Sequence, residues 1–199
     1  CGCVASFFNI PYINQGVASD PSSSWQVRSR SKVYKALRPG IAFYGDHVER
    51  YKDTVSNFAS QIGCGAVLGT KFTWPKDNPY VTEGKFVLQP NDEPKYKKWI
   101  GIYNQKMLSK GKYLGNLYDL GYDLPETHVI AKGDTLYYAF YNDNWKGNVS
   151  LKGLSPNTKY RLYDYYNNKE LGEVSISNPS IEAGFQHFLL IEAIPEISK

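Results

Sequence analysis

The sequence is poor in sulfur, with three cysteines (Cys1, Cys3 and Cys64) and one methionine (Met107) in 199 residues. Three cysteines cannot all pair with one another, which argues against a disulfide scaffold and leaves the compartment unknown. Because the chain starts at Cys1 rather than at a methionine, we expect a piece of a longer polypeptide. The location of the parent protein is unknown from the sequence, and a periplasmic or secreted parent is plausible.

Long apolar runs and strong charge are also missing. No stretch is apolar enough to span a bilayer and no signal peptide is visible, so we expect no membrane partner. The net charge of +4 is mild and does not indicate nucleic-acid binding. The densest basic cluster, residues 95–99, is best explained as the solvent-exposed face of an amphipathic helix.

Motifs for common cofactor and nucleophile chemistry are absent: there is no Ser-His-Asp elbow, phosphate loop, dinucleotide fingerprint or zinc pair. Asp46, His47 and Glu49 are the nearest approach to a ligand cluster, but their spacing matches a metal site weakly. A hydrogen-bonded strand end is the favoured explanation for this cluster, and a role in orienting a substrate hydroxyl is the alternative. We expect no cofactor and no metal.

Aromatic residues, in contrast, are abundant at 15%, with 17 tyrosines and four tryptophans. Tyrosine and tryptophan combine an apolar face with a polar tip, which suits clefts that bind sugars. Strands also favour aromatic residues, and this simpler explanation accounts for much of the excess.

Residues 17–28 form the stretch around which the chain is organised. A strand is expected to end near Ala18, and Pro21 and three serines then open a helix over 22–37. Asp20 lies between the two and is the first candidate for covalent chemistry. A plain helix cap explains Asp20 equally simply, and the local sequence alone favours the cap.

The rest of residues 1–122 has the sequence pattern of an α/β domain, in which strands and helices alternate. We expect a buried strand over 41–44 that ends in Gly45-Asp46-His47, a helix over 51–62, a glycine-rich segment over 63–70 and a helix from about 93 to Gly111. The last helix carries a core-facing stripe that comprises Tyr96, Trp99, Ile100, Tyr103 and Met107.

The sequence pattern changes at residues 123–126, where we place a domain boundary. Short strands with turn residues between them follow and predict an antiparallel β-sandwich over 123–199. The predicted fold class is therefore α/β plus all-β. A closed eight-stranded barrel needs about 250 residues, so the first domain, 1–122, holds at most two or three strand–helix units of one.

Taken in order, these elements resemble the carboxyl-terminal half of melibiase-type α-galactosidases, which belong to glycoside hydrolase clan D; the match is family 36-like. The most specific pieces are Ser19-Asp20 and the run from Leu151 to Tyr160, Leu-Lys-Gly-Leu-Ser-Pro-Asn-Thr-Lys-Tyr. The resemblance implies the last strand–helix units of a (β/α)8 catalytic barrel over 1–122 and a β-sandwich behind it. It also implies retaining cleavage of α-galactosides, with an oligosaccharide or glycoside as the partner.

By the same resemblance, Asp20 is the general acid/base. The residues implied to bind substrate are Cys1, Gly2, Trp25, Arg28, Asp46 and His47. The family's second aspartate and its arginine after the Ser-Asp motif are replaced by Ser23 and Val27, with Arg28 one place late. These departures leave the subgroup and the exact sugar open.

The family's nucleophile stands in a Lys-Trp-Asp or Lys-Tyr-Asp motif, and neither occurs in these residues. Retaining hydrolysis needs two carboxylates about 5–5.5 Å apart. We therefore expect the nucleophile upstream of Cys1 and an inactive isolated chain. An opened barrel would also leave strand edges unpaired, so we expect self-association.

Two other functional classes remain open. The β-domain could be a carbohydrate-binding module that uses Tyr163, Tyr165 and Tyr166, or it could be a structural cover for the barrel remnant.

Overall fold

The computed structural model describes residues 21–37, 43–49, 56–71 and 93–196. Contacts divide the chain into two compact units, residues 1–109 and residues 110–199. The predicted boundary at 122/123 falls inside the second unit, because residues 112–113 already pair with a strand of that unit. Each unit is described by itself below.

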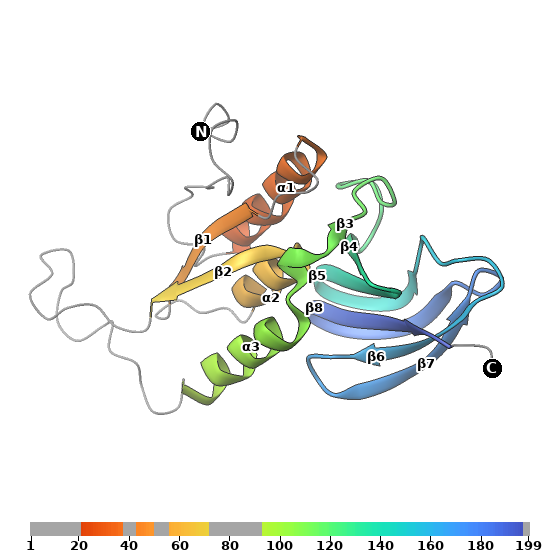
Figure 1. The fold of residues 1–199 in the computed structure, drawn as a ribbon. Helices are drawn as coiled ribbons and strands as arrows, with labels where there is room; N and C mark the ends of the chain where they lie inside the picture. Colours follow the sequence, from red (N-terminus) through yellow and green to blue (C-terminus); the bar gives the residue numbers. More distant parts are fainter. Residues whose placement is uncertain (1–20, 38–42, 50–55, 72–92, 197–199) are drawn as a thin grey trace, which may run out of the picture. The chain divides into compact units, whose positions relative to one another are not determined.

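Helix α1 (Pro21–Leu37) opens the described part of the first unit (Figure 1). Pro21 occupies the first helical position, where its fixed φ is favourable and its missing N–H costs nothing. One face of the helix is buried and comprises Ser24, Val27, Arg28, Ser31 and Lys35. This spacing of three and four residues confirms the predicted helix and shows which side packs inward.

A strand–helix–strand segment follows α1. It consists of β1 (Phe43–Glu49), α2 (Ser56–Gly63) and β2 (Ala66–Lys71), and the two strands pair in parallel. Helix α2 is buried all round from Phe58 to Ile62, as expected for a helix inside a core. The first strand continues beyond Tyr44, so the predicted end of the strand there was wrong. Most of the glycine-rich segment 63–70 belongs to strand β2, which extends to Lys71.

Helix α3 (Glu93–Lys106) begins near the predicted residue but ends before Gly111. Met107 has a φ of +45°, and a short 3₁₀ turn, η3 (Leu108–Lys110), follows it. Tyr96 and Trp99 are buried as predicted, and both rings pack on Phe58 of α2, with centroids 5.3 and 5.8 Å away. Ile102, rather than Ile100, completes the buried face.

The second unit is one six-stranded antiparallel sheet in the order β3-β4-β5-β8-β6-β7 (Figure 1). Its strands are β3 (Lys112–Tyr113), β4 (Glu126–Lys132), β5 (Thr135–Ser150), β6 (Lys159–Asp164), β7 (Lys169–Ser175) and β8 (Ser180–Pro195). The sequence pattern predicts separate strands over 135–141 and 149–151, but the structure has one long strand, β5, over this region. The hydrogen bonds thus join one continuous sheet where the sequence predicts a sandwich of two.

A β-bulge in β5 explains why the sequence pattern predicts two strands where the structure has one. Asn142 pairs with His187 and Trp145 pairs with Phe185, so Asp143 and Asn144 together face Gln186 alone. The extra residue changes which positions face the core, from Tyr138 and Phe140 before the bulge to odd-numbered positions such as Val149 after it. The apolar pattern therefore loses its regular alternation at the Asn-Asp-Asn sequence, although the strand continues.

Candidate functional site

The carboxyl edge of the parallel pair β1–β2 is the place where an α/β unit presents its chemistry. Tyr44 pairs with Val67 and His47 pairs with Gly69, so Gly45 and Asp46 together face Leu68. This is a second bulge, formed by Gly45 and Asp46, and His47 follows it directly as a paired residue. Both candidates therefore lie on the strand itself rather than after it.

Arg28, a candidate for substrate binding, reaches into the first unit. Its side chain is buried, and Nη1 donates a 2.9 Å hydrogen bond to Oγ of Ser60 on α2. A buried arginine that joins two helices holds their spacing, and a hydrogen bond to a charged donor contributes about 1.5–3 kcal/mol. This contact gives Arg28 a structural role, and its proposed role toward substrate remains a prediction.

Trp25, three residues before Arg28, lies on the outer face of the same helix. Its side chain is 53% exposed, so it is available to a ligand. Cys1, Gly2 and Asp20 lie outside the described residues. Of the predicted site residues, the structure thus brings Trp25 and Arg28 onto α1, and Asp46 and His47 onto β1.

Burial affects one other group of α1. Lys35 is buried, and burial lowers the pKa of its ammonium, an effect that the nearby Cys64 partly opposes. Cys64 is a free, buried cysteine that packs with Val27 and Ala66 in the core of this unit. It therefore serves packing rather than chemistry.

The run from Leu151 to Tyr160, which contributes most to the resemblance, is a structural element of the second unit. Leu151, Leu154 and Tyr160 belong to its hydrophobic core. Gly153 has a φ of +91°, and a Cβ there would lie 2.7 Å from Cδ1 of Leu117. The backbone N–H of Ser155 donates a 3.2 Å hydrogen bond to the hydroxyl of Tyr160. The motif thus specifies a tightly packed loop.

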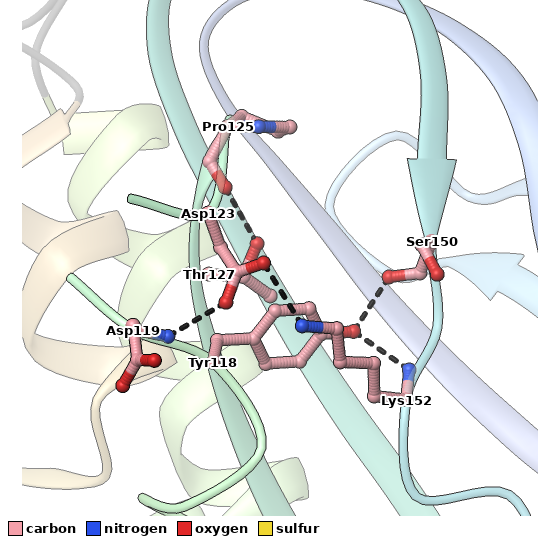
Figure 2. Close-up of polar contacts among 7 residues, drawn as sticks. All are labelled: Tyr118, Asp119, Asp123, Pro125, Thr127, Ser150 and Lys152. Atoms are coloured by element: carbon pink, nitrogen blue, oxygen red, sulfur yellow. Dashed lines mark hydrogen bonds and ion pairs between the residues drawn. The ribbon is translucent and has the colours of Figure 1, made fainter. Parts of the chain in front are cut away.

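Lys152 ties this loop to the segment before β4 (Figure 2). Its Nζ lies 2.9 Å from Oδ1 of Asp123 and 4.7 Å from the centre of the Tyr118 ring. Oδ2 of Asp123 also accepts a 2.7 Å hydrogen bond from the N–H of Asp119. The Tyr118 hydroxyl donates to the Ser150 carbonyl at 2.5 Å and accepts from the Lys152 N–H at 2.7 Å. Sequence patterns gave no sign of this cluster, because its members are far apart in the chain.

A second polar cluster of this unit is buried around His128 on β4. Nδ1 of His128 lies 2.7 Å from the Tyr113 hydroxyl, and Nε2 lies 2.8 Å from Oε1 of Glu126. A carboxylate can only accept, so Nε2 carries a hydrogen, and a neutral ring then accepts the Tyr113 O–H at Nδ1. The three groups form one directed chain of hydrogen bonds, which gives His128 a structural role.

Among the described residues, no three of the side chains His, Cys, Asp and Glu gather in a way that could hold a metal ion. Across the same parts of the chain, every helix is too short or too polar to cross a bilayer.

No protein-family model matches the chain. The whole chain is similar to part of the A type blood α-D-galactosamine galactosaminidase of Flavonifractor plautii, at 34% identity over 207 residues. The chain spans 17% of the length of that relative. The similarity is to one stretch of a much longer protein.

Two solved structures show the same fold at low identity. The GH27 β-L-arabinopyranosidase of Geobacillus stearothermophilus has a TM-score of 0.62 at 10% identity, with 98% of this chain and 47% of that chain covered. α-Galactosidase I of Mortierella vinacea has a TM-score of 0.50 at 10% identity, with 94% and 50% covered. An α/β part followed by a mostly antiparallel sheet is thus an arrangement shared with about half of each enzyme.

Proposed function

We propose that this chain is part of a retaining glycoside hydrolase that releases terminal α-linked galactose or galactosamine from glycans. The observation that carries the proposal is the 34% identity, along the full length of the chain, with a galactosaminidase. The family 36-like subgroup stays part of the proposal, since a solved structure that shares the fold is a GH27 enzyme. The residues after Asp20 depart from the family pattern, which also leaves the subgroup undecided.

In this proposal residues 1–122 supply the last strand–helix units of a (β/α)8 barrel. The parallel pair β1–β2 with α2 between the strands is one such unit, and α1 leads into it. The carboxyl ends of barrel strands carry the active site in this architecture. That edge would place Asp46 and His47 beside the sugar, and Cys1, Gly2 and Trp25 at the margin of the pocket.

Asp20 is proposed as the general acid/base. Its carboxyl group would protonate the glycosidic oxygen as the C1–O bond breaks, while a second carboxylate attacks C1. Asp20 would then take a proton from the water that releases the sugar. The second carboxylate is not in a recognisable motif of this chain, so we place it in the remainder of the parent protein and expect the isolated chain to be inactive.

The identity of the sugar is the part of the proposal that the F. plautii relative refines. Its name specifies α-D-galactosamine, so the substrate proposed here is a galacto-configured α-glycoside with hydroxyl or amino substitution at C2. The second unit would act as a structural support, because the Lys152 cluster and the His128 cluster use their polar groups internally.

The test compares the full natural polypeptide with this 199-residue chain. Both are assayed on p-nitrophenyl α-galactoside, α-galactosaminide and α-N-acetylgalactosaminide, with the first-formed anomer identified by NMR. We expect the parent to cleave at least one substrate with release of the α-anomer, and the chain alone to cleave none. A parent that is inert on all three substrates, or that first releases the β-anomer, would contradict the proposal.

A further inference from the structure

The second half of helix α1 exposes a group of apolar side chains. Val33 is 58% exposed and Leu37 is 68% exposed, and the two lie four residues apart on one side of the helix. Ala36 is exposed three residues after Val33, and its small side chain lets another helix approach closely. Scattered exposed apolar residues are normal, whereas neighbouring ones on one face mark a contact surface.

The opposite side of α1 already has its partners within the first unit. Val27 packs with Cys64 in the core of this unit, and Arg28 donates a hydrogen bond to Ser60 of α2. Lys35 continues the buried side toward the end of the helix. The exposed apolar side chains therefore lie on a face of α1 that the core of this unit does not use.

Basic residues border this face on both sides. Arg30 is exposed three residues before Val33, and Lys32 is partly exposed four residues before Ala36. The helix contains no aspartate or glutamate, and Arg30 makes no ion pair with any described residue. We call this surface the Val33 face; it comprises Arg30, Lys32, Val33, Ala36 and Leu37. A partner that places carboxylates at its two borders would complement its charge.

A second copy of this chain is a poor match for the Val33 face. A symmetric contact between two α1 helices would bring the basic borders of both copies together, and like charges in an interface are unfavourable. A helix from the same parent protein meets no such obstacle. The chain spans 17% of its relative, and a (β/α)8 barrel surrounds its strands with a closed ring of helices. Each helix of a ring has two neighbours, and α2 is one neighbour of α1.

We propose that the Val33 face binds an amphipathic helix from the remainder of the parent protein, and that this helix carries apolar residues bordered by Asp or Glu. The inference rests on the proposed function only in its use of the barrel. Leu37 lies about 18 Å along the helix axis from Trp25, at 1.5 Å per residue. Changes at Val33 and Leu37 are therefore distant from the residue of α1 that we place at the margin of the sugar pocket.

Hydroxyl-radical footprinting read by mass spectrometry tests the contact without any substitution. It compares the oxidation of the Val33 and Leu37 side chains in this 199-residue chain and in the full natural polypeptide. We expect both side chains to be oxidised in the chain and to be protected severalfold in the full polypeptide. Ile176, which is 56% exposed on the second unit, is the internal reference and should react equally in both proteins.

Substitutions test the chemistry of the partner. Val33→Asp should lower the unfolding midpoint of the full polypeptide, because it places a charge in an apolar contact, and should leave the midpoint of the chain unchanged. Ile176→Asp is the matched control and should change neither midpoint. Arg30→Glu should lower the midpoint of the full polypeptide further than Arg30→Gln does, because a glutamate repels the carboxylates of the partner.

Three results would overturn the proposal. The first is equal oxidation of Leu37 in the two proteins. The second is protection of Leu37 in the chain alone that grows with its concentration, which would assign the face to a second copy. The third is equal midpoints for Arg30→Glu and Arg30→Gln, which would exclude an acidic partner. Footprinting does not depend on catalysis, so a full polypeptide that protects Leu37 but cleaves no glycoside would reject the hydrolase and keep this interface.

Discussion

The phenol oxygen of Tyr118 accepts a 2.7 Å hydrogen bond from the backbone N–H of Lys152, although 34 positions separate the two residues in the chain. The same hydroxyl donates to the carbonyl of Ser150. One side chain therefore satisfies two backbone groups where β5 ends and the Leu-Lys-Gly-Leu loop begins. This bridge is the basis of the first prediction.

Tyr118→Phe should destabilise the second unit by about 1–3 kcal/mol, because it leaves a backbone donor and a backbone acceptor without their partner. Thermal unfolding followed by circular dichroism measures the effect. Tyr122→Phe is the matched control, since the Tyr122 side chain is 90% exposed, and it should change the midpoint little. Equal midpoints for the two variants would show that the bridge contributes nothing.

Buried tyrosines should make the second unit sensitive to alkali. Burial raises the pKa of the Tyr118 and Tyr138 hydroxyls well above the ordinary value of about 10. Above pH ~10 the tyrosines of the unfolded chain lose protons that the buried tyrosines of the folded chain retain. The stability that comes from burying these neutral hydroxyls is therefore complete below pH ~10 and declines as the pH rises further. Urea unfolding at a series of alkaline pH values should show a decline that is shallower in Tyr118→Phe. An unchanged slope in that variant would contradict the assignment.

The buried chain from Tyr113 through His128 to Glu126 predicts a pairwise coupling. Tyr113→Phe removes the donor to Nδ1 and should cost about 1 kcal/mol, and His128→Gln should cost more because it removes the ring that makes both hydrogen bonds, to Tyr113 and to Glu126. The double variant should cost less than the sum of the two, as expected for groups in direct contact. His187→Asn serves as the control because His187 is exposed and has a φ of +65°. Strict additivity would refute a direct bond.

Gly153 should be intolerant of any side chain. Both Gly153 and Gly172 have positive φ, at +91° and +103°, so alanine is strained at either position. A Cβ at Gly153 also meets Leu117 at 2.7 Å, whereas nothing lies within 4 Å of a Cβ at Gly172. Gly153→Ala should therefore lower the unfolding midpoint further than Gly172→Ala does. If the reverse holds, the loop does not pack against Leu117 as described.

The sequence predicted elements best where the local signal was strong. Pro21 and the serines after it mark the start of α1, and the polar break at Arg38 marks the residue after its end. The prediction failed where a strand contained a bulge, since the extra residue at Asn142–Trp145 breaks the alternation that identifies a strand. Two expected strands proved to be one, β5, and hydrogen bonds join the six strands of the second unit in one order.

The candidate site was predictable only in part, for a related reason. Asp46 and His47 stay predictions as site residues; the sequence nominates them because they follow Gly45 near the end of an apolar run, but the bulge at Gly45 and Asp46 depends on pairing with β2. The resemblance implied a substrate-binding role for Arg28, and only the contact with Ser60 shows its structural role. Tyr118 gave no sequence signal, because its significance comes from contacts with Ser150 and Lys152, which are distant in the chain.

The central claim is that Asp20 is the acid/base of a retaining hydrolase, and the leaving group tests it most directly. Asp20→Ala in the full natural polypeptide should nearly abolish hydrolysis of a natural α-galactoside or α-galactosaminide, whose leaving oxygen needs a proton. Hydrolysis of the matching 2,4-dinitrophenyl glycoside should slow far less when the step that breaks the glycosidic bond is measured, because dinitrophenolate leaves without taking a proton. Equal losses on both substrates would contradict the account.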